Sequence, residues 1–163
     1  MLRHLLNFIL YLLPPTKFFL FRSRLLNFAG IKLGKNVCFC GHGWIYGRGN
    51  LSIGDSTWLS PRVIFYTHLN ANILIGSNCD IGPGVNFIIG SHEISTNNNR
   101  RAGKGKSNSI IIGNGCWIGA NSTILDGVSI GNGVIIASGS IVTKSVPEGV
   151  LYAGVPAVFK RNL

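Results

Sequence analysis

The chain has 163 residues, which is enough for one domain with a substantial core and too few for a second sizeable domain. Its hydrophobic content of 46% excludes an intrinsically disordered protein, and its 22 glycines follow no three-residue period, which excludes a collagen-like chain. The formal net charge is +10 and no acidic residue precedes Asp55, which favours either an anionic partner or a solvated basic surface.

The first residues predict two short helices. Residues 5–13 are apolar, two prolines interrupt them, and a second apolar run covers residues 18–21. Neither run approaches the ~20 residues of a membrane-spanning helix, and no small-residue cleavage site of a secretory signal follows. We therefore expect a cytoplasmic protein with an N-terminal helical segment over residues 1–29. Its leucine, aromatic and basic side chains are typical of a membrane interface, although packing against the fold or a neighbouring subunit is a compatible alternative.

From residue 110 the chain repeats every six residues. Aliphatic side chains occupy six equivalent positions without a slip, at Ile112, Ile118, Ile124, Ile130, Ile136 and Val142. Small or branched residues follow each of them by four positions, at Cys116, Ser122, Val128, Val134, Ser140 and Val146. A period of six fits neither a helix nor an open sheet, and indicates a coil in which each unit forms one short strand and one turn. Three units would close a triangular rung of about 18 residues that stacks on the next rung at ~4.8 Å.

An interruption of this repeat predicts an excursion from the coil. The pattern also occurs at Leu33, Ile53, Ile75 and Ile81, but 37 residues separate Ile75 from Ile112, one more than six units. The polar, basic and glycine-rich residues 93–109 carry the break. We predict that they form a loop outside the coil, and such loops often carry function.

The four cysteines predict neither a disulfide nor a zinc site. They form no Cys-x-x-Cys pair, and Cys38 and Cys40 are too close in sequence for a comfortable bridge. No second pair of Cys or His residues follows at finger-like spacing. We interpret them as reduced core thiols of a cytoplasmic protein.

The repeat region resembles the hexapeptide-repeat acyltransferases. NGCWIGANSTIL (114–125) resembles the Trp-Ile-Gly rung of that family, and IASGSIVTKSVPEGVLYAGVPA (136–157) resembles its closing segment. The resemblance implies an all-β, left-handed parallel β-helix over residues 30–163 with a short C-terminal helix at about 155–163. It also implies a homotrimer with acetyl-CoA between adjacent coils. The basic start FRSRLLNFAGIKLGKNV (21–37) looks like bacterial O-acetyltransferases of surface polysaccharide, capsule or O-antigen. The implied acceptor is a sugar or glycan, including a lipid-linked one, at the inner face of the cytoplasmic membrane.

Histidine is the residue type expected to activate a sugar hydroxyl, because imidazole can accept a proton near neutral pH. His92 in IIGSHEIS matches the catalytic histidine of the galactoside and maltose acetyltransferase branch, where a similar stretch precedes the loop. The adjacent Glu93 is a candidate to orient the imidazole, with a backbone carbonyl as an equally good partner. His68 in FYTHLN resembles a histidine of serine acetyltransferases, and either lines the acceptor pocket or caps a turn. Ser60 falls where related enzymes carry an acceptor-contacting Asn, so this departure leaves acceptor recognition open.

The resemblance also implies a cofactor groove. Backbone contacts to the pantetheine arm are expected from Gly119, Ala120 and Ser138. Trp117 is expected to pack beside the arm or to serve as a core or interface residue. The nucleotide phosphates would meet Thr143, Lys144, Lys160 and Arg161. The basic loop side chains either close over CoA, meet an anionic glycan or remain solvated, and they are Arg100, Arg101, Lys104 and Lys106.

Other functions fit the sequence less well. A carbonic anhydrase of the same coil needs converging histidines, but His42, His68 and His92 are 26 and 24 residues apart, not multiples of 18, so no metal site is expected. An antibiotic or serine-type acetyltransferase of the same superfamily remains an alternative, as does a non-enzymatic, membrane-associated binding scaffold. Nucleic-acid binding is not expected, because only the net charge supports it and no recognition motif is present.

Overall fold

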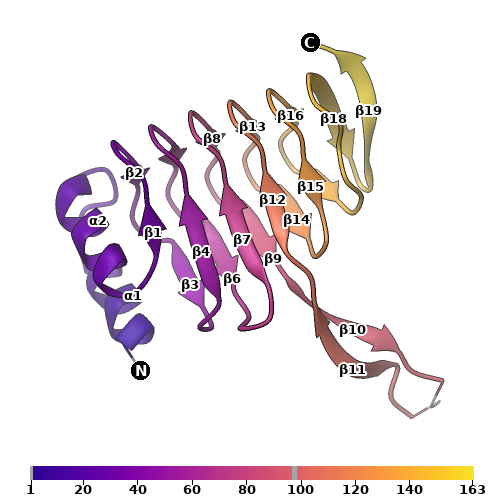
Figure 1. The fold of residues 1–163 in the computed structure, drawn as a ribbon, viewed down its shortest axis with the longest axis horizontal. Helices are drawn as coiled ribbons and strands as arrows, with labels where there is room; N and C mark the ends of the chain where they lie inside the picture. Colours follow the sequence, from indigo (N-terminus) through magenta and orange to yellow (C-terminus); the bar gives the residue numbers. More distant parts are fainter. Residues whose placement is uncertain (1, 97–98) are drawn as a thin grey trace.

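The protein is a three-sided parallel β-helix with two helices at one end. The structure is a computed structural model that describes residues 2–96 and 99–163. The coil runs from the helices to the C-terminal strands, and one antiparallel hairpin projects from it (Figure 1). The β-helix predicted from the six-residue period is confirmed.

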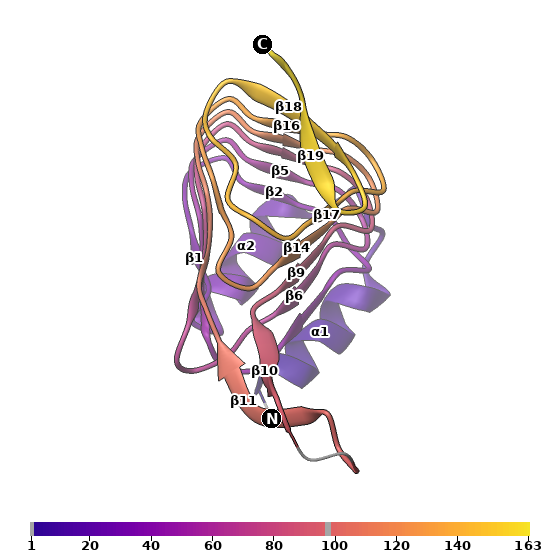
Figure 2. The ribbon, with the colours of Figure 1, turned by 90° about the vertical axis from the view of Figure 1, so that its right-hand side faces the viewer.

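Three sheets form the three faces of the coil, and each rung contributes one strand to each face (Figure 2). Face A contains β1 (Lys32–Leu33), β4 (Asn50–Ile53), β7 (Asn72–Ile75), β12 (Ile110–Ile112) and β15 (Ser129–Ile130). Face B contains β2 (Cys38–Phe39), β5 (Trp58–Leu59), β8 (Asp80–Ile81), β13 (Trp117–Ile118), β16 (Ile135–Ile136), β18 (Val150–Gly154) and β19 (Ala157–Asn162). Face C contains β3 (Trp44–Tyr46), β6 (Ile64–Tyr66), β9 (Asn86–Ile88), β14 (Thr123–Leu125) and β17 (Ile141–Val142).

The interior of the coil holds the predicted aliphatic columns. All six repeat positions from Ile112 to Val142 are at most 2% exposed. Equivalent residues of successive rungs pair directly, so that Ile124 lies between Phe87 and Val142 on face C. In the earlier rungs Phe65 stacks on Phe87 with ring centroids 5.0 Å apart. Stacking like residues on like residues buries the apolar side chains of every rung and lets the rungs hydrogen-bond to each other.

Rung length varies at one corner only, the corner between faces C and A. Ile112 pairs with Ile130 over 18 residues, whereas Ile53 pairs with Ile75 over 22 and Ile75 pairs with Ile112 over 37. Steps from face A to B and from B to C keep the six-residue spacing, because Ile53, Leu59 and Phe65 occupy equivalent positions on the three faces. The additional residues of each long rung therefore all leave the coil at this corner, which we call the C–A corner.

The longest insertion at the C–A corner is a β-hairpin rather than a loop. β10 (Gly90–Ile94) pairs antiparallel with β11 (Ala102–Ser107), with Gly90 opposite Ser107 and His92 opposite Gly105. The predicted excursion from the coil at residues 93–109 is confirmed. The predicted loop conformation is wrong, because most of the described residues of this segment belong to the two strands of the hairpin. Pairing of the two arms satisfies their backbone groups away from the coil. Residues 97 and 98 of the predicted loop lie outside the described residues.

The N-terminal segment packs on the first rung of the coil. Packing against the fold was one of the two roles expected for it, beside contact with a membrane. α1 (Leu2–Leu12) and α2 (Phe19–Phe28) lie at the end of the coil (Figure 1) and bury Leu6, Leu10 and Leu26 in its core. Neither of the two helices described is long and apolar enough to cross a membrane. Together they cover the hydrophobic interior that the first rung would otherwise expose.

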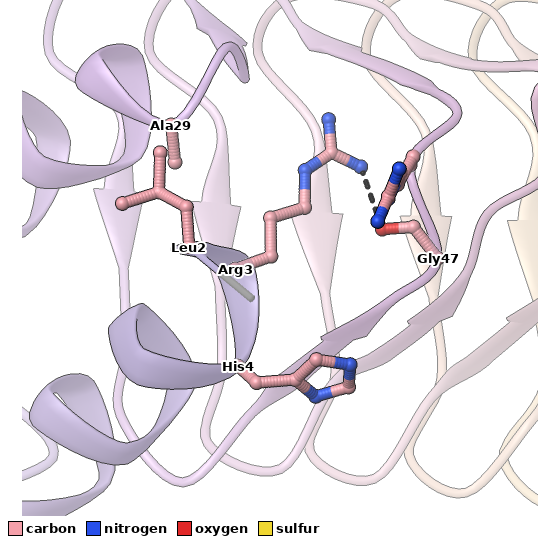
Figure 3. A pocket seen from close by; sticks show the side chains of 6 residues that line it. Leu2, Arg3, His4, Ala29 and Gly47 are labelled. Atoms are coloured by element: carbon pink, nitrogen blue, oxygen red, sulfur yellow. Dashed lines mark hydrogen bonds between the residues drawn. The ribbon is translucent and has the colours of Figure 1, made fainter.

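Polar side chains fasten these helices to the backbone of the coil. The amide of Asn7 is buried and pairs with both backbone groups of Ile45, donating to its carbonyl at 2.9 Å and accepting from its N–H at 3.1 Å. Arg3 donates to the carbonyls of Gly47 and Gly49 at the C–A corner, beside a hollow of about 450 Å³ (Figure 3). The fully buried Arg22 donates to four backbone carbonyls, those of Leu10, Leu13, Pro14 and Lys17.

The Asn7 contact gives a testable prediction. Replacing Asn7 with Leu keeps the volume but leaves the Ile45 N–H and carbonyl unpaired in a buried position, at about 1–3 kcal/mol for each group. We expect the Asn7→Leu variant to lose about 2–5 kcal/mol of unfolding free energy in chemical denaturation. His4→Ala, at an exposed position of the same helix, serves as the control and should change stability little. Equal stability of the two variants would contradict the capping role of Asn7.

The C-terminal segment differs from the prediction. Residues 155–163 were expected to form a short helix, but β19 is a strand that pairs antiparallel with β18, with Leu151 opposite Arg161. A helix would leave the free edge of β18, the last parallel strand of face B, without partners. Pairing with β19 satisfies that edge. The two ends of the coil are therefore closed by different means, helices at one end and an antiparallel strand at the other.

The cysteines are thiols without disulfide partners, as predicted. Cys40, Cys79 and Cys116 are buried. Burial raises the pKa of the Cys40 thiol to about 11, so this thiol stays protonated at neutral pH and serves as a packing group.

Candidate functional site

Two of the predicted site residues meet at the base of the hairpin. His68 lies in the insertion at the C–A corner of one rung and His92 lies on β10 in the insertion of the next rung. Both line an open pocket of about 460 Å³, together with Asn70, Ser107 and Lys106. The spacing of His68 and His92 is not a multiple of 18, yet they share a pocket because the rung that separates them is longer than 18 residues.

A backbone carbonyl fixes the orientation of the His92 ring. Nδ1 of His92 lies 3.0 Å from the carbonyl oxygen of Gly103 on the opposite arm of the hairpin. A carbonyl oxygen can only accept, so in the neutral imidazole the proton lies on Nδ1 and Nε2 keeps a free lone pair. The ring is exposed, so Nε2 is available to a bound hydroxyl. This is the tautomer that a general base requires.

His68 has the opposite tautomer. Its Nδ1 accepts a hydrogen bond from the backbone N–H of Asn70 at 3.3 Å, and the Ser107 hydroxyl lies 3.1 Å from the same nitrogen. A backbone N–H can only donate, so Nδ1 of the neutral ring carries no proton and Nε2 carries it. The pocket therefore contains one imidazole that can accept a proton at Nε2 and one that can donate a hydrogen bond from Nε2.

The partner of His92 is the carbonyl rather than Glu93. Nδ1 of His92 contacts the Gly103 carbonyl oxygen at 3.0 Å, and the hairpin register shifts between His92 and Ile94, at Glu93. Glu93 is exposed. The Gly103 carbonyl supplies the orienting contact that the sequence left open between the two groups.

The predicted acceptor residue Ser60 lies elsewhere. Ser60 shares a second open pocket of about 440 Å³ on face B with Trp58, Asp80 and Trp117. The hairpin leaves the coil at the C–A corner, on the side opposite face B (Figures 1 and 2). Within one chain, Ser60 and the two histidines are not brought together.

Most of the predicted cofactor residues lie on the same side as Ser60, over the last rungs, but Thr143 and Lys144 lie at the C–A corner. Gly119, Ala120 and Ser138 meet at the corner between faces B and C, where a Cβ at Gly119 would overlap the backbone of Ser138. Trp117 precedes them on β13 and is 57% exposed, which excludes it from the core. The charged and polar residues expected at the nucleotide are all exposed, with Thr143 and Lys144 after β17 and Lys160 and Arg161 on β19.

Three groups of the histidine pocket were not predicted: the Gly103 carbonyl, Ser107 and Asn70. The first two reach the histidines through hairpin pairing, which places residues more than ten positions apart side by side. A signal was present in the sequence, because two short polar segments flank three consecutive asparagines, a pattern that favours a hairpin.

Among the residues that the structure describes, no group of three or more His, Cys, Asp or Glu side chains lies close enough to hold a metal ion. His42, the third histidine of the carbonic anhydrase comparison, packs against Tyr11 with ring centroids 5.0 Å apart.

Comparisons with known proteins identify similar chains. The family "Bacterial transferase hexapeptide (six repeats)" matches residues 109–144. The galactoside O-acetyltransferase of Escherichia coli K12 is 35% identical, over 69% of this chain and 64% of its own length. The putative colanic acid biosynthesis acetyltransferase WcaF of the same organism is 31% identical, over 91% of this chain and 78% of its own length.

A solved structure extends the comparison over nearly the whole chain. The hexapeptide-repeat acetyltransferase of Vibrio cholerae, solved in complex with acetyl-CoA, superposes with a TM-score of 0.78 at 27% identity. The match covers 99% of this chain and 85% of that protein. The chain spans somewhat less than two thirds of the galactoside relative and most of the other two.

Proposed function

Because the chain belongs to the hexapeptide-repeat acetyltransferases, which share its left-handed β-helix, we propose that it transfers an acetyl group from acetyl-CoA to a hydroxyl of a sugar, with His92 as general base. The observation that carries the proposal is the hydrogen bond from His92 to the Gly103 carbonyl, which leaves Nε2 unprotonated in an open pocket. Two of the relatives named above carry the names of galactoside and colanic acid biosynthesis acetyltransferases, which supports a sugar acceptor. The Vibrio cholerae acetyltransferase was solved with acetyl-CoA, which supports the same donor here.

The proposed chemistry uses His92 twice. Nε2 accepts the proton of the acceptor hydroxyl while its oxygen attacks the thioester carbonyl carbon. The carbon–sulfur bond then breaks, and the imidazolium returns the proton to the departing sulfur, so an ester and a free thiol are formed. The Gly103 carbonyl accepts from Nδ1–H throughout and stabilises the imidazolium.

We propose that the complete site forms between subunits of a homotrimer. The histidine pocket and the proposed pantetheine residues, which begin at Trp117 on face B, lie on opposite sides of one coil, so the corner of one subunit has to meet face B of the next. Trp117, 57% exposed on face B, then packs beside the pantetheine arm in the groove. Gly119, Ala120 and Ser138 line the arm, and the basic residues of the C-terminal rungs, Lys144, Lys160 and Arg161, together with Thr143, meet the nucleotide phosphates.

The function is tested by thiol release. Purified protein is incubated with acetyl-CoA and a panel of neutral sugars, charged sugars, nucleotide sugars, lipid-linked glycans, L-serine and a hydroxyl-bearing antibiotic. We expect acceptor-dependent thiol release with the sugars and, by mass spectrometry, a product that has gained one acetyl group. Release with serine or the antibiotic alone would move the acceptor to another class. Acetyl-CoA binding without turnover of any acceptor would favour a binding scaffold.

We further propose that the N-terminal helices place the enzyme on the inner face of the cytoplasmic membrane, where it modifies a glycan of surface polysaccharide, capsule or O-antigen. α1 is apolar on two faces: one packs on the coil, and the opposite one exposes Leu5, Phe8 and Leu12 by more than half. Basic side chains surround the helices in sequence, and an acidic one first occurs at Asp55. An exposed apolar face with basic flanks is the composition of an interfacial helix.

This contact predicts lipid-dependent binding. Replacing Leu5, Phe8 and Leu12 together with Ser should abolish cosedimentation with vesicles that contain anionic phosphatidylglycerol, while the coil stays folded because the three side chains are exposed. Val158→Ser, at an exposed apolar position of β19 at the other end of the coil, is the control. Equal cosedimentation of both variants would favour packing against a neighbouring subunit as the role of this face.

A further inference from the structure

The charged groups of the histidine pocket are all positive. Among the described residues that line it, Lys106 is the one with a permanent charge, and Asp and Glu are absent. The acceptors that face a ligand there are Nε2 of His92 and the neutral amide and hydroxyl groups of the wall. His68 adds a hydrogen-bond donor at Nε2, because its Nδ1 is occupied by the Asn70 N–H and the Ser107 hydroxyl.

The hairpin above the pocket extends this positive charge. Between Gly90 and Asn108 the sequence contains four basic side chains against the single carboxylate of Glu93. All four are exposed, and they are Arg100, Arg101, Lys104 and Lys106. Like charges on one short hairpin repel each other and do not stabilise it, so an anionic ligand would lower the free energy of the arrangement.

The backbone leaves room for such a ligand. Gly90 and Gly105 both line the pocket, and a Cβ built on either would meet no atom within 4 Å. Gly105 is paired with His92, so the wall opposite the proposed base is bare backbone. The space beside Lys106 and His92 is therefore open to a substituent of the acceptor.

We propose that the natural acceptor carries an anionic group, a carboxylate or a phosphate, which Lys106 and the Nε2–H of His68 bind next to the hydroxyl that His92 activates. This rests on the proposed function and names the substrate class of that site. A carboxylate or phosphate offers only acceptor oxygens, which match an ammonium and an N–H donor, and charge-assisted bonds of this kind are about twice as strong as neutral ones. The hairpin cations continue the contact along an acidic glycan.

The cations of the hairpin have a second conceivable ligand, the phosphates of CoA. Of the residues proposed to meet those phosphates, Lys160 and Arg161 lie on β19 of face B, whereas Thr143 and Lys144 follow β17 at the C–A corner, two rungs along the coil from the hairpin. Lys106 lines the same pocket as His92, so the acceptor bound beside the proposed base is the ligand that its position favours. Separate Michaelis constants for the acceptor and for acetyl-CoA distinguish the two.

The test compares three matched acceptors: a neutral hexose, the corresponding hexuronate and the corresponding hexose phosphate. We expect kcat/KM of the wild-type protein to be at least about tenfold higher for one or both charged acceptors, and the difference to shrink with added salt. Lys106→Met should lower kcat/KM for the charged acceptors about tenfold or more, with the neutral hexose and the KM for acetyl-CoA changed less than about twofold. Comparison of kcat/KM for the hexuronate with that for the hexose phosphate shows which anion is bound.

Two further variants control the comparison. Arg24→Gln removes one exposed charge from α2 and should leave the preference for charged acceptors unchanged. His68→Leu should weaken the preference, and His68→Gln, which restores an N–H donor near the position of Nε2, should recover part of it. Equal or better turnover of the neutral hexose by wild-type protein overturns the proposal and leaves the proposed function standing. A rise in the KM for acetyl-CoA in Lys106→Met also overturns the proposal and leaves the proposed function standing. Thiol release with none of the acceptors overturns the proposed function as well.

Discussion

Replacing His92 with Ala is expected to reduce the rate of acetyl transfer by about 10²–10⁴-fold, the usual contribution of a general base. The variant should keep its fold, because the His92 ring is exposed and contributes to no part of the core. Turnover is measured by thiol release at saturating acetyl-CoA. Light scattering should give the mass of a trimer for both proteins, which separates loss of the base from loss of the assembly.

The carbonyl contact of His92 offers a sharper control. In His92→Asn the side-chain amide can still donate to the Gly103 carbonyl, 3.0 Å from Nδ1 in the native protein, and so preserve the link between the hairpin arms. It lacks a group that can accept a proton at the position of Nε2. The Asn variant should therefore be as inactive as the Ala variant. Recovery of most of the activity in His92→Asn would show that the histidine only fastens the hairpin, and His68 would become the next candidate for the base.

Replacing Ile124 with Asp is expected to prevent folding. Ile124 is 0% exposed and lies between Phe87 and Val142 inside the coil. The substitution removes an aliphatic side chain, at about 2–5 kcal/mol, and places a carboxylate where it has neither water nor a partner, at several kcal/mol more. This total is comparable with the whole stability of a domain, about 5–15 kcal/mol.

Ile111→Asp is the matched control for that prediction. Ile111 belongs to β12, the face A strand of the same rung, but points outward and is 44% exposed, so the same change of residue leaves the carboxylate in water. We expect Ile111→Asp to be recovered as folded protein with a β-rich circular dichroism spectrum, and Ile124→Asp to be insoluble or unfolded. A soluble, β-rich Ile124→Asp protein would show that this position does not face the interior.

The parts of the fold that follow a strict repeat were predictable from sequence. Ile112, Ile124 and Ile136 recur at a fixed period because each occupies the same place on a face, and this period identified the coil. The two helices were predictable for a comparable local reason, since the prolines interrupt an apolar run. His92 was identified through resemblance, and its tautomer became evident only from the hairpin.

The features that were wrong or missing depend on contacts between distant segments. The C-terminal strand β19 forms because β18 has an unpaired edge, which no local pattern around residue 157 encodes. His68 and His92 share a pocket because the rung between them is longer than the 18-residue repeat. The additional residues of that rung carry no periodic signal, so the sequence does not reveal this contact. Arg22 is a basic residue in an apolar run and nothing local predicts its burial, yet it is fully buried because its guanidinium donates hydrogen bonds to four backbone carbonyls in and after α1.

The confinement of every insertion to the C–A corner has a consequence for how such a protein can change. Residues added there alter neither the side-chain register of a face nor the interior, so this edge can accept segments of new length and composition without a loss of stability elsewhere. Acceptor specificity can then diversify through changes at the C–A corner, while the coil that supports it stays the same. Grafting a hairpin of different charge between Ile89 and Ile110, both fully buried anchors, is the most conservative route to an altered acceptor.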